Sequence, residues 1–182
     1  IRSVIWVQGC SLACEGCWNR DYWPHKGGEL LKVNELHQKL MKFSQVDGIT
    51  ILGGEPLQQP NALLKLLKLQ KKAGRNIMLY SGYEINELNK IQKECFELSD
   101  IAIMGRYDEK LRDVTLRWRG STNQVLCSPT GAFDVNSIDD GEREVELHIG
   151  KGGELTILGY PDIDLINEIL ENVVEGLNGS VL

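Results

Sequence analysis

The sequence predicts an α/β protein built around a parallel sheet. Short runs of β-branched and apolar residues alternate with segments in which apolar residues recur every three or four positions, the spacing of amphipathic helices. In addition, each unusual cluster of polar residues or glycines follows directly after one of the predicted strands. Alternation of strands and helices builds a parallel sheet with right-handed crossovers.

Four strands and three helices occupy the first two-thirds of the chain. The strands are expected at residues 3–7, 48–52, 76–80 and 101–104. The helices are expected from Val33 to Phe43, between Pro60 and Gly74, and from Ile85 to Phe96. Proline suits the first turn of a helix and glycine suits a left-handed C-cap, so Pro60 and Gly74 mark the limits of the second helix.

The pattern changes in the last third of the chain. A short fifth strand is expected at residues 124–127, followed by a loop at 129–143 that is rich in Ser, Asp, Asn and Gly. Alternating apolar residues at 145–149 and 155–158, joined by a glycine-rich turn, predict a β-hairpin. A final helix is expected after Pro161.

We expect one domain, in which residues 1–128 form the core and residues 129–182 form an extension that packs on it. The chain has 182 residues, 42% of them hydrophobic, which suffices for one sizeable core. The first residue is Ile1 rather than Met, so we expect that residues upstream of it are missing from this sequence.

Charge and composition disfavour several classes of function. A formal charge of -6 lacks the basic footprint of a protein that binds duplex nucleic acid. No apolar stretch approaches the roughly 20 residues that a membrane helix needs, and no secretory signal opens the chain. Five cysteines, an odd number, argue against a disulfide framework. We therefore expect a cytoplasmic protein with no membrane or nucleic-acid partner.

Three of the cysteines lie close together. Cys10, Cys14 and Cys17 put three thiols into eight residues, with no fourth cysteine nearby in the sequence. Thiolates select zinc, copper(I) or iron–sulfur clusters, and a structural zinc site needs four protein ligands. The motif therefore predicts a metal or cluster site with one open position.

A zinc knuckle is the alternative for this motif, with His25, Cys95 or Cys127 as the fourth ligand. Zinc sites usually combine one close pair of cysteines with a distant pair, which three cysteines in one loop fit poorly. Cys95 lies on the apolar stripe of a predicted helix and is expected in the core. A lone histidine beside Pro24 is more often exposed than bound to a metal.

Further polar clusters follow the next three strands. Gly53-Gly54-Glu55 follows the second strand, Ser81 follows the third and Arg106 follows the fourth. Because the carboxyl ends of parallel strands share one edge, these residues and the cysteines are expected to converge there. Gly53 and Gly54 let the backbone approach a ligand closely, although a tight strand-to-helix turn alone would also explain them.

The two motifs together resemble the radical S-adenosylmethionine (SAM) superfamily. Residues 10–17 match its Cys-x3-Cys-x2-Cys signature, and Gly53-Gly54-Glu55 matches its second motif. Within the superfamily the sequence is most similar to the small activating enzymes of anaerobic ribonucleotide reductase. That similarity covers about residues 1–126 and rests on the segments 8–10, 16–19, 53–57, 81–83, 105–107 and 119–124.

The resemblance implies a fold and two cofactors. The implied fold is a partial, laterally open parallel (βα) barrel. Cys10, Cys14 and Cys17 would bind three irons of a [4Fe-4S] cluster, and the fourth iron would chelate SAM. The Gly53-Gly54-Glu55 segment would hold the methionine amine.

The resemblance also implies roles for three further residues and for partners. Trp18 is expected to pack against the adenine, Ser81 to meet the ribose or the methionyl group, and Arg106 to bind the carboxylate. The expected product is a 5′-deoxyadenosyl radical that takes hydrogen from the α-carbon of a glycine in a partner glycyl radical enzyme. Flavodoxin or ferredoxin is the expected electron donor. No general base or other catalytic residue is assigned.

Two other functions are compatible with the same sequence. One is a small radical SAM enzyme that modifies a peptide or a small molecule, with residues 129–182 shaping its pocket. The other is a non-catalytic zinc or iron–sulfur binding module, which would ignore SAM.

Overall fold

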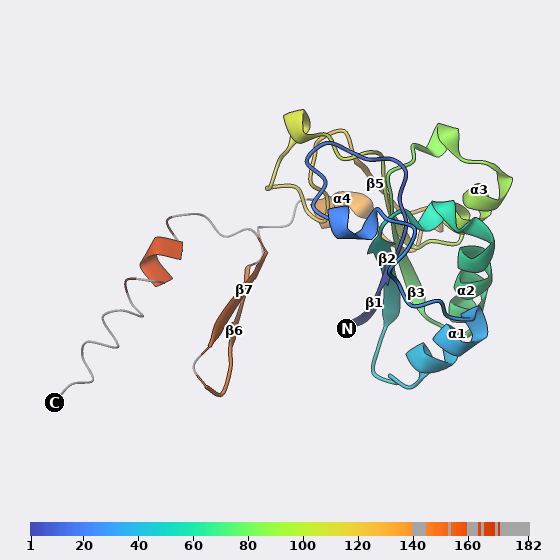
Figure 1. Ribbon diagram of the computed structural model, residues 1–182, viewed down its shortest axis with the longest axis horizontal. Coiled ribbons are helices and arrows are strands. Elements are labelled where there is room, and N and C mark those ends of the chain that lie inside the picture. Colours follow the sequence, from blue (N-terminus) through green and yellow to red (C-terminus); the bar gives the residue numbers. More distant parts are fainter. Residues whose placement is uncertain (140–144, 153, 160–163, 165, 170, 172–182) are drawn as a thin grey trace. The chain divides into compact units, whose positions relative to one another are not determined.

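The computed structural model describes residues 1–139, 145–152, 154–159, 164, 166–169 and 171. The chain divides into two compact units, residues 1–140 and residues 141–182. Figure 1 labels most of the helices and strands of the two units. Every residue that the sequence predicts for the site belongs to the first unit. The packing of the extension on the core stays a prediction.

The first unit is built on a five-stranded sheet. Its strands, in spatial order, are β1 (Arg2–Val7), β2 (Gly48–Gly53), β3 (Asn76–Ser81), β4 (Ile101–Met104) and β5 (Val125–Cys127). The first four strands are parallel, whereas β5 runs antiparallel to β4. The α/β class and the mainly parallel sheet are thus confirmed, and β1 and β5 form the edges of this sheet.

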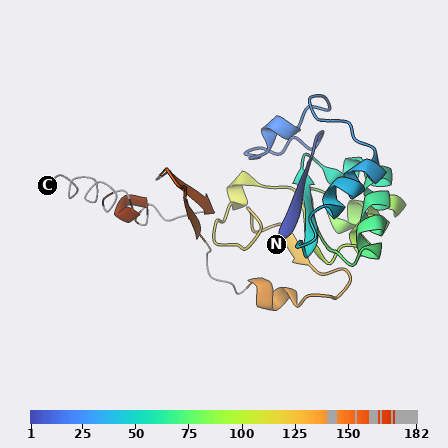
Figure 2. The same cartoon turned by 90° about the horizontal axis from the view of Figure 1, so that it is seen from below.

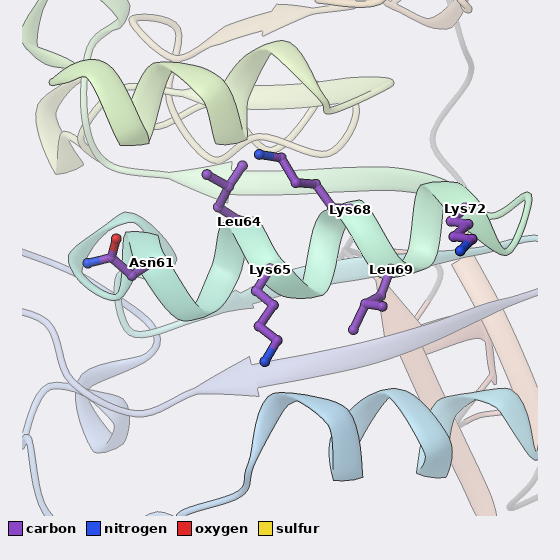
Figure 3. Close-up of a pocket in the computed structure, with 6 residues that line it drawn as sticks. All are labelled: Asn61, Leu64, Lys65, Lys68, Leu69 and Lys72. Carbon is purple, nitrogen blue, oxygen red and sulfur yellow. The ribbon is translucent and has the colours of Figure 1, made fainter.

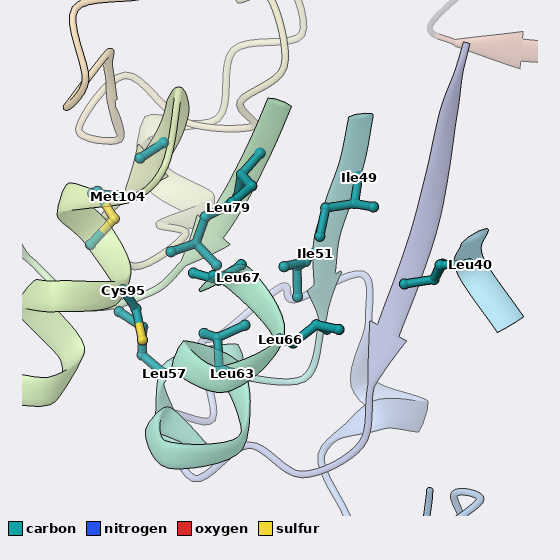
Figure 4. Close-up of a cluster of buried hydrophobic side chains, with 12 residues drawn as sticks. Leu40, Ile49, Ile51, Leu57, Leu63, Leu66, Leu67, Leu79, Cys95 and Met104 are labelled. Carbon is teal, nitrogen blue, oxygen red and sulfur yellow. The ribbon is translucent and has the colours of Figure 1, made fainter. Parts of the chain in front are cut away.

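Three helices cover one face of the sheet. They are α1 (Val33–Met41), α2 (Pro60–Lys72) and α3 (Lys90–Glu97), and Figure 2 shows them grouped on one side of the strands. Their apolar side chains meet those of β2, β3 and β4 in the main buried cluster, part of which Figure 4 labels: Leu40, Ile49, Ile51, Leu57, Leu63, Leu66, Leu67, Leu79, Cys95 and Met104. Burial of this apolar surface is the main force that holds the helices on the sheet.

The predicted limits of the second helix are confirmed. Pro60 stands at the start of α2, where its missing N–H group costs nothing. Gly74 follows the last turn with a φ of 76°, the left-handed conformation that ends many helices.

Alternation along the strands supplies a second, smaller cluster on the other face of the sheet. On β3, Ile77 and Leu79 belong to the main cluster, whereas Met78 between them belongs to the smaller one. Successive side chains of a strand point to opposite faces. The smaller cluster consists of Met78, Ile101, Ile103 and Leu126, with Tyr80 and Val135 packed against it. Both faces of the central strands are therefore buried.

The helix predicted from Ile85 to Phe96 is wrong as a single element. The chain instead forms a 3-10 turn, η3 (Ile85–Glu87), followed by α3. The side chain of Asn89 accepts hydrogen bonds from the backbone N–H groups of Ile91 and Gln92 at 3.0 and 3.1 Å. This N-cap starts a new helix, so the apolar spacing runs across two elements.

Two smaller predictions also need correction. The loop predicted at 129–143 contains a short helix, α4 (Val135–Asp139). Asp134 accepts a hydrogen bond from the N–H of Asn136 at 3.1 Å, and Val135 packs on the smaller cluster, which together favour the helical turn. Phe43 lies beyond the end of α1 and is exposed, so it does not extend that helix's buried stripe.

The second unit contains the predicted β-hairpin. Strands β6 (Val145–Ile149) and β7 (Leu155–Gly159) pair antiparallel, which confirms the prediction. Of the predicted final helix, residues 164, 166–169 and 171 are helical, and its other residues lie outside the described part of the chain. None of the helices described has both the length and the apolar character that crossing a membrane requires.

Candidate metal centre

The structure brings the predicted polar segments to one edge of the sheet. The cysteine loop, residues 10–17, follows β1, and Gly54 and Glu55 follow β2. Ser81 ends β3, and Arg106 comes two residues after the end of β4. Since β1 to β4 are parallel, all four segments lie at their carboxyl ends. The predicted convergence is confirmed.

The three clustered cysteines share one partly buried environment. Burial raises the pKa of Cys10, while the backbone N–H groups of Leu12 and Ala13 act in the opposite direction. Burial also raises the pKa of Cys14, and the negative charges of Cys17 and Cys10 add to that effect. The thiols are therefore close enough to repel one another as thiolates, and a bound cation would relieve the repulsion.

Backbone N–H groups point at the sulfurs of this loop. The N–H of Asn19 donates to the Cys17 sulfur at 3.4 Å. The N–H of Tyr107, from the segment after β4, favours the thiolate of Cys14. Hydrogen bonds to sulfur are one of the ways in which a protein sets the potential of an iron–sulfur cluster.

The donor set fits a cluster better than it fits one metal ion. Among the described residues, no three His, Cys, Asp or Glu side chains are gathered closely enough to hold a single ion. A zinc ion would need its ligand sulfurs about 2.3 Å from one point. In a [4Fe-4S] cluster each thiolate binds a different iron, so three sulfurs spread along a loop suit it.

Of the remaining cysteines, Cys95 lies in the core, as predicted, and Cys127 is half-buried beside it. Cys95 is fully buried and its thiol lies 3.5 Å from the carbonyl of Pro60. Cys127 packs against the same cluster from β5. Burial raises the pKa of each thiol to about 11, so both stay protonated at neutral pH and are poor metal ligands. His25 packs its ring against Gly9, next to the cysteine loop.

The segment after β2 is hydrogen-bonded through its backbone to the end of β1 and to Gly9, the residue before Cys10. The N–H of Gly54 donates to the carbonyl of Val7 at 2.7 Å, and the N–H of Glu55 donates to the carbonyl of Gly9 at 2.9 Å. A Cβ atom on Gly54 would collide with the carbonyl groups of Gly9 and Tyr22. Gly53 has a φ of 110°, which a side chain rarely tolerates. Both glycines are therefore required for this contact.

Glu55 faces the protein interior. Only 1% of the Glu55 surface is exposed to solvent. One carboxylate oxygen accepts from the N–H of Leu57 at 2.8 Å and from the hydroxyl of Ser81 at 2.9 Å, and the other accepts from the N–H of Gly82 at 2.7 Å. Burial raises the pKa of Glu55, whereas these three hydrogen bonds favour the charged form. The carboxylate thus ties the end of β2 to the end of β3.

Ser81 and Arg106 already have protein partners. The Ser81 hydroxyl donates to Glu55 and accepts from the N–H of Tyr83 at 3.1 Å. The Arg106 guanidinium makes two hydrogen bonds, of 2.8 and 3.0 Å, to the carboxylate of Glu87. This pair raises the pKa of Arg106 and lowers that of Glu87.

Trp18 lies directly after the third cysteine and is 55% exposed. The guanidinium carbon of Arg112 lies 5.7 Å from the centre of its ring, a cation–π distance. The indole is therefore at the surface beside the cysteine loop, where a planar ligand can reach it.

Sequence reasoning missed several residues that shape this edge. Gln58 bonds to Ser11 in the cysteine loop, and Gln59 donates to the carbonyl of Gln8 at 2.8 Å. Glu109 lies against Gly16 and accepts a hydrogen bond from the hydroxyl of Tyr107. The signal for the glutamines was available, since two amides in the turn that follows a glycine-rich segment can bond to neighbouring loops.

The segment 119–124 supports the loop after β4. The side chain of Asn123 donates to the carbonyl of Arg106 at 2.8 Å, and that of Gln124 donates to the carbonyl of Gly105 at 3.2 Å. The Gln124 side-chain oxygen also accepts from the N–H of Gly120 at 2.9 Å. These residues hold the loop that presents Tyr107 to Cys14.

A separate shallow groove lies along α2. Figure 3 shows its lining side chains, and none of them was predicted for the site: Asn61, Leu64, Lys65, Lys68, Leu69 and Lys72.

Comparison with known proteins agrees with this geometry. Residues 1–127 match the family described as a 4Fe-4S single cluster domain. The chain is 32% identical over 136 residues to the anaerobic ribonucleoside-triphosphate reductase-activating protein of Escherichia coli K12, an alignment that covers 69% of this chain and 86% of that protein. It is 36% identical over 137 residues to the protein of the same name from Enterobacteria phage T4, with 71% and 85% covered.

The sheet, the cysteine loop and the family match define an iron–sulfur enzyme of the radical SAM class. Within that class the chain belongs to the family of anaerobic ribonucleoside-triphosphate reductase-activating proteins. Its cofactors are a [4Fe-4S] cluster and SAM.

Proposed function

We propose that this protein activates a glycyl radical enzyme of the anaerobic ribonucleotide reductase type, by removing hydrogen from the α-carbon of a glycine. The names of the relatives support this partner. The observation that carries the proposal is the direct backbone contact between the Gly53-Gly54-Glu55 segment and residues 7–9, which lead into the cysteine loop at the carboxyl edge of the sheet. That contact supports a cluster site and a SAM site that lie side by side.

Cys10, Cys14 and Cys17 are the proposed cluster ligands. Three protein ligands would leave one iron of the cluster without a protein ligand, and SAM is the proposed occupant of that position. When bound, the reduced cluster supplies one electron that cleaves SAM into methionine and a 5′-deoxyadenosyl radical. The protein's own task is to hold the reactants in place and keep them apart from water, so no acid or base is assigned.

The carbonyl groups of Gly53 and Gly54 are the proposed acceptors for the methionine amine. The N–H groups of Gly54 and Glu55 point at the backbone of residues 7 and 9. In a trans peptide the carbonyl points the opposite way from the N–H, and the described chain has no cis bond. The two carbonyls therefore face away from β1, while the buried Glu55 carboxylate fixes the segment that carries them.

The proposal keeps the predicted roles of Trp18 and Arg106 and changes that of Ser81. Trp18 offers an exposed ring for the adenine, and Arg106 offers a guanidinium for the carboxylate of SAM. Ser81 contributes through its hydrogen bond to Glu55, because its hydroxyl is buried. To bind the carboxylate of SAM, Arg106 would give up part of its hydrogen bonding to Glu87.

A partial, laterally open barrel is the proposed form of the sheet. Support comes from the strand order, which rises from β1 to β4 without a reversal, and from the grouping of α1, α2 and α3 on one face. A one-electron donor such as flavodoxin or ferredoxin, and a cytoplasmic location, belong to the same proposal.

Electron paramagnetic resonance tests the activating role. The reconstituted, reduced protein would be mixed with SAM and an anaerobic ribonucleotide reductase, and the spectrum of the reductase recorded. The proposal predicts a glycyl doublet that is absent without SAM and absent when the partner glycine is replaced by alanine. SAM cleavage without any doublet, together with turnover of a peptide or small molecule, would instead favour the small-substrate enzyme.

A further inference from the structure

Gln58 joins the segment after β2 to the cysteine loop. It is the last residue of the 3-10 turn η2 (Pro56–Gln58). Its side-chain oxygen accepts from the backbone N–H of Ser11 at 3.1 Å, and its side-chain nitrogen donates to the hydroxyl of Ser11 at 2.7 Å. Two hydrogen bonds between one amide and one residue fix both the distance and the rotation of that residue.

The position of Ser11 makes this contact consequential. Ser11 directly follows Cys10 and lies in the stretch that leads to Cys14. The serine is exposed, so the rest of the protein offers little packing to hold it. The backbone N–H groups that approach the Cys10 sulfur belong to Leu12 and Ala13, the next two residues. A shift of Ser11 would therefore move both the ligand sulfurs and the groups that bond to them.

Gln58 also reaches the loop after β3. Its side-chain nitrogen lies 3.3 Å from the hydroxyl oxygen of Tyr83, to which it donates. The adjacent Gly82 donates to Glu55, and a Cβ at Gly82 would collide with the side chain of Leu12. One glutamine thus contacts the cysteine loop and the β3 loop from the segment that follows Gly53-Gly54-Glu55.

We infer that Gln58 is a positioning residue that sets the register between the three cysteines and the SAM-holding glycines. This inference rests on the proposed function and adds to it a residue that neither motif contains. Gln58 touches no reacting atom; it acts through Ser11 on the ligand loop and through Tyr83 on the facing loop. Outer partners of this kind typically change ligand affinity or activity by about 10-fold or more when removed.

The test compares Gln58→Met with Gln38→Met. Methionine keeps the length of the side chain but cannot replace the hydrogen bonds. Gln38 lies exposed on α1 and provides the same chemical change away from the site. Each protein is reconstituted with iron and sulfide, and two quantities are measured: the rate of iron loss to a chelator, and SAM affinity from the change in the spectrum of the reduced cluster.

We expect Gln58→Met to assemble a cluster, to lose iron about 10-fold faster and to bind SAM about 10-fold more weakly, while Gln38→Met behaves as wild type. Ser11→Ala removes the hydroxyl but keeps the backbone N–H that donates to Gln58, so it should give a smaller change in the same direction. The double variant Ser11→Ala/Gln58→Met should be no worse than Gln58→Met, because that variant already lacks both hydrogen bonds to Ser11. The thermal midpoint of the metal-free protein should stay unchanged.

Equal iron loss and equal SAM affinity in wild type and Gln58→Met would overturn the inference. A lowered thermal midpoint of metal-free Gln58→Met that accounts for the losses would also overturn it, since the residue would then only support the fold. Both results leave the proposed function intact when the wild type holds its cluster and cleaves SAM. A wild-type protein that assembles no cluster would overturn the proposed function itself.

Discussion

The hydroxyl of Ser81 donates a hydrogen bond of 2.9 Å to the buried carboxylate of Glu55. Ser81 ends β3 and Glu55 lies two residues beyond the end of β2, while the pairing of these two strands stops earlier, at Ile51 and Leu79. Beyond that point the carboxylate takes the place of the missing backbone ladder, because it accepts from the N–H groups of Leu57 and Gly82 as well. Within the second motif, Glu55 therefore supports the fold, whereas Gly53 and Gly54 approach the residues that lead into the cysteine loop.

Replacing Glu55 by glutamine should destabilise the fold. The new amide group places a donor where three donors already converge, and at least one buried hydrogen bond is lost. We expect a loss of about 1–3 kcal/mol in the free energy of unfolding, measured by urea titration. Glu97→Gln, on the exposed end of α3, is the matched control and should leave the value within about 0.5 kcal/mol. Equal stability of the two variants would show that Glu55 is not the tie between β2 and β3.

The cysteines should divide into ligands and core residues. Cys14→Ala is expected to abolish cluster assembly, measured as iron and sulfide bound per protein after anaerobic reconstitution. Cys95→Ala removes a thiol that is buried beside Pro60 and protonated at neutral pH, so it should keep its iron. Equal iron loss in the two variants would contradict the assignment of the cluster to the loop.

We expect that position 54 tolerates no side chain, because an added atom would clash with its neighbours and not because the backbone is strained. The φ of Gly54 is not among the positive values, but an added Cβ would press on the carbonyl of Gly9. Overpacking of this kind costs about 1–3 kcal/mol, so Gly54→Ala should weaken SAM binding about 10-fold or more, measured by anaerobic calorimetry. In contrast, Gly131→Ala has a positive φ of 69° but open space around it and lies far along the chain from both motifs. If Gly131→Ala weakened SAM binding as much, close approach would not be the cause.

Asp100 should make stability fall in acid. Burial alone would raise its pKa, but hydrogen bonds from Lys71, the N–H of Ile77 and Thr130 outweigh burial and lower the pKa below 3.8. The unfolded chain then binds the proton more readily, so this contribution is complete above about pH 4 and is lost as the pH falls through the lower folded pKa.

The measurement is the urea midpoint of wild type and Asp100→Asn at several pH values between about 5 and 3. The variant should be less stable at the upper value and should show a smaller decline in acid. Asp21→Asn, at an exposed position, is the control and should decline as wild type does. An equally steep decline in Asp100→Asn would assign the acid sensitivity to other groups.

The sequence predicted the architecture of the first unit where periodicity was strong. The four parallel strands and the limits of α2 followed from apolar spacing and from Pro60 and Gly74. The break between η3 and α3 was missed because Asn89 interrupts the backbone while the apolar spacing continues across it. The helix α4 was missed because Val135, which packs on the smaller cluster, sits in a polar segment.

For the site, the sequence predicted which segments converge but not how their side chains are used. Motif spacing indicated the three cysteines and Gly53-Gly54-Glu55. It could not show that Ser81 and Glu55 bond to each other, since that depends on how far β2 and β3 separate at their ends. Two amides after a glycine-rich segment indicated that Gln58 and Gln59 could bond to a neighbouring loop, but the sequence could not show that Gln58 bonds to Ser11, 47 residues away in the chain.

Anaerobic detection of 5′-deoxyadenosine is the most direct test of the proposed chemistry. The protein would be reconstituted with iron and sulfide, reduced with dithionite and incubated with SAM, and the products separated and quantified. We predict 5′-deoxyadenosine and methionine in equal amounts from wild type and neither product from Cys14→Ala. A brown, fully reduced wild-type protein that forms no 5′-deoxyadenosine would contradict the assignment of this chain as a SAM-cleaving enzyme.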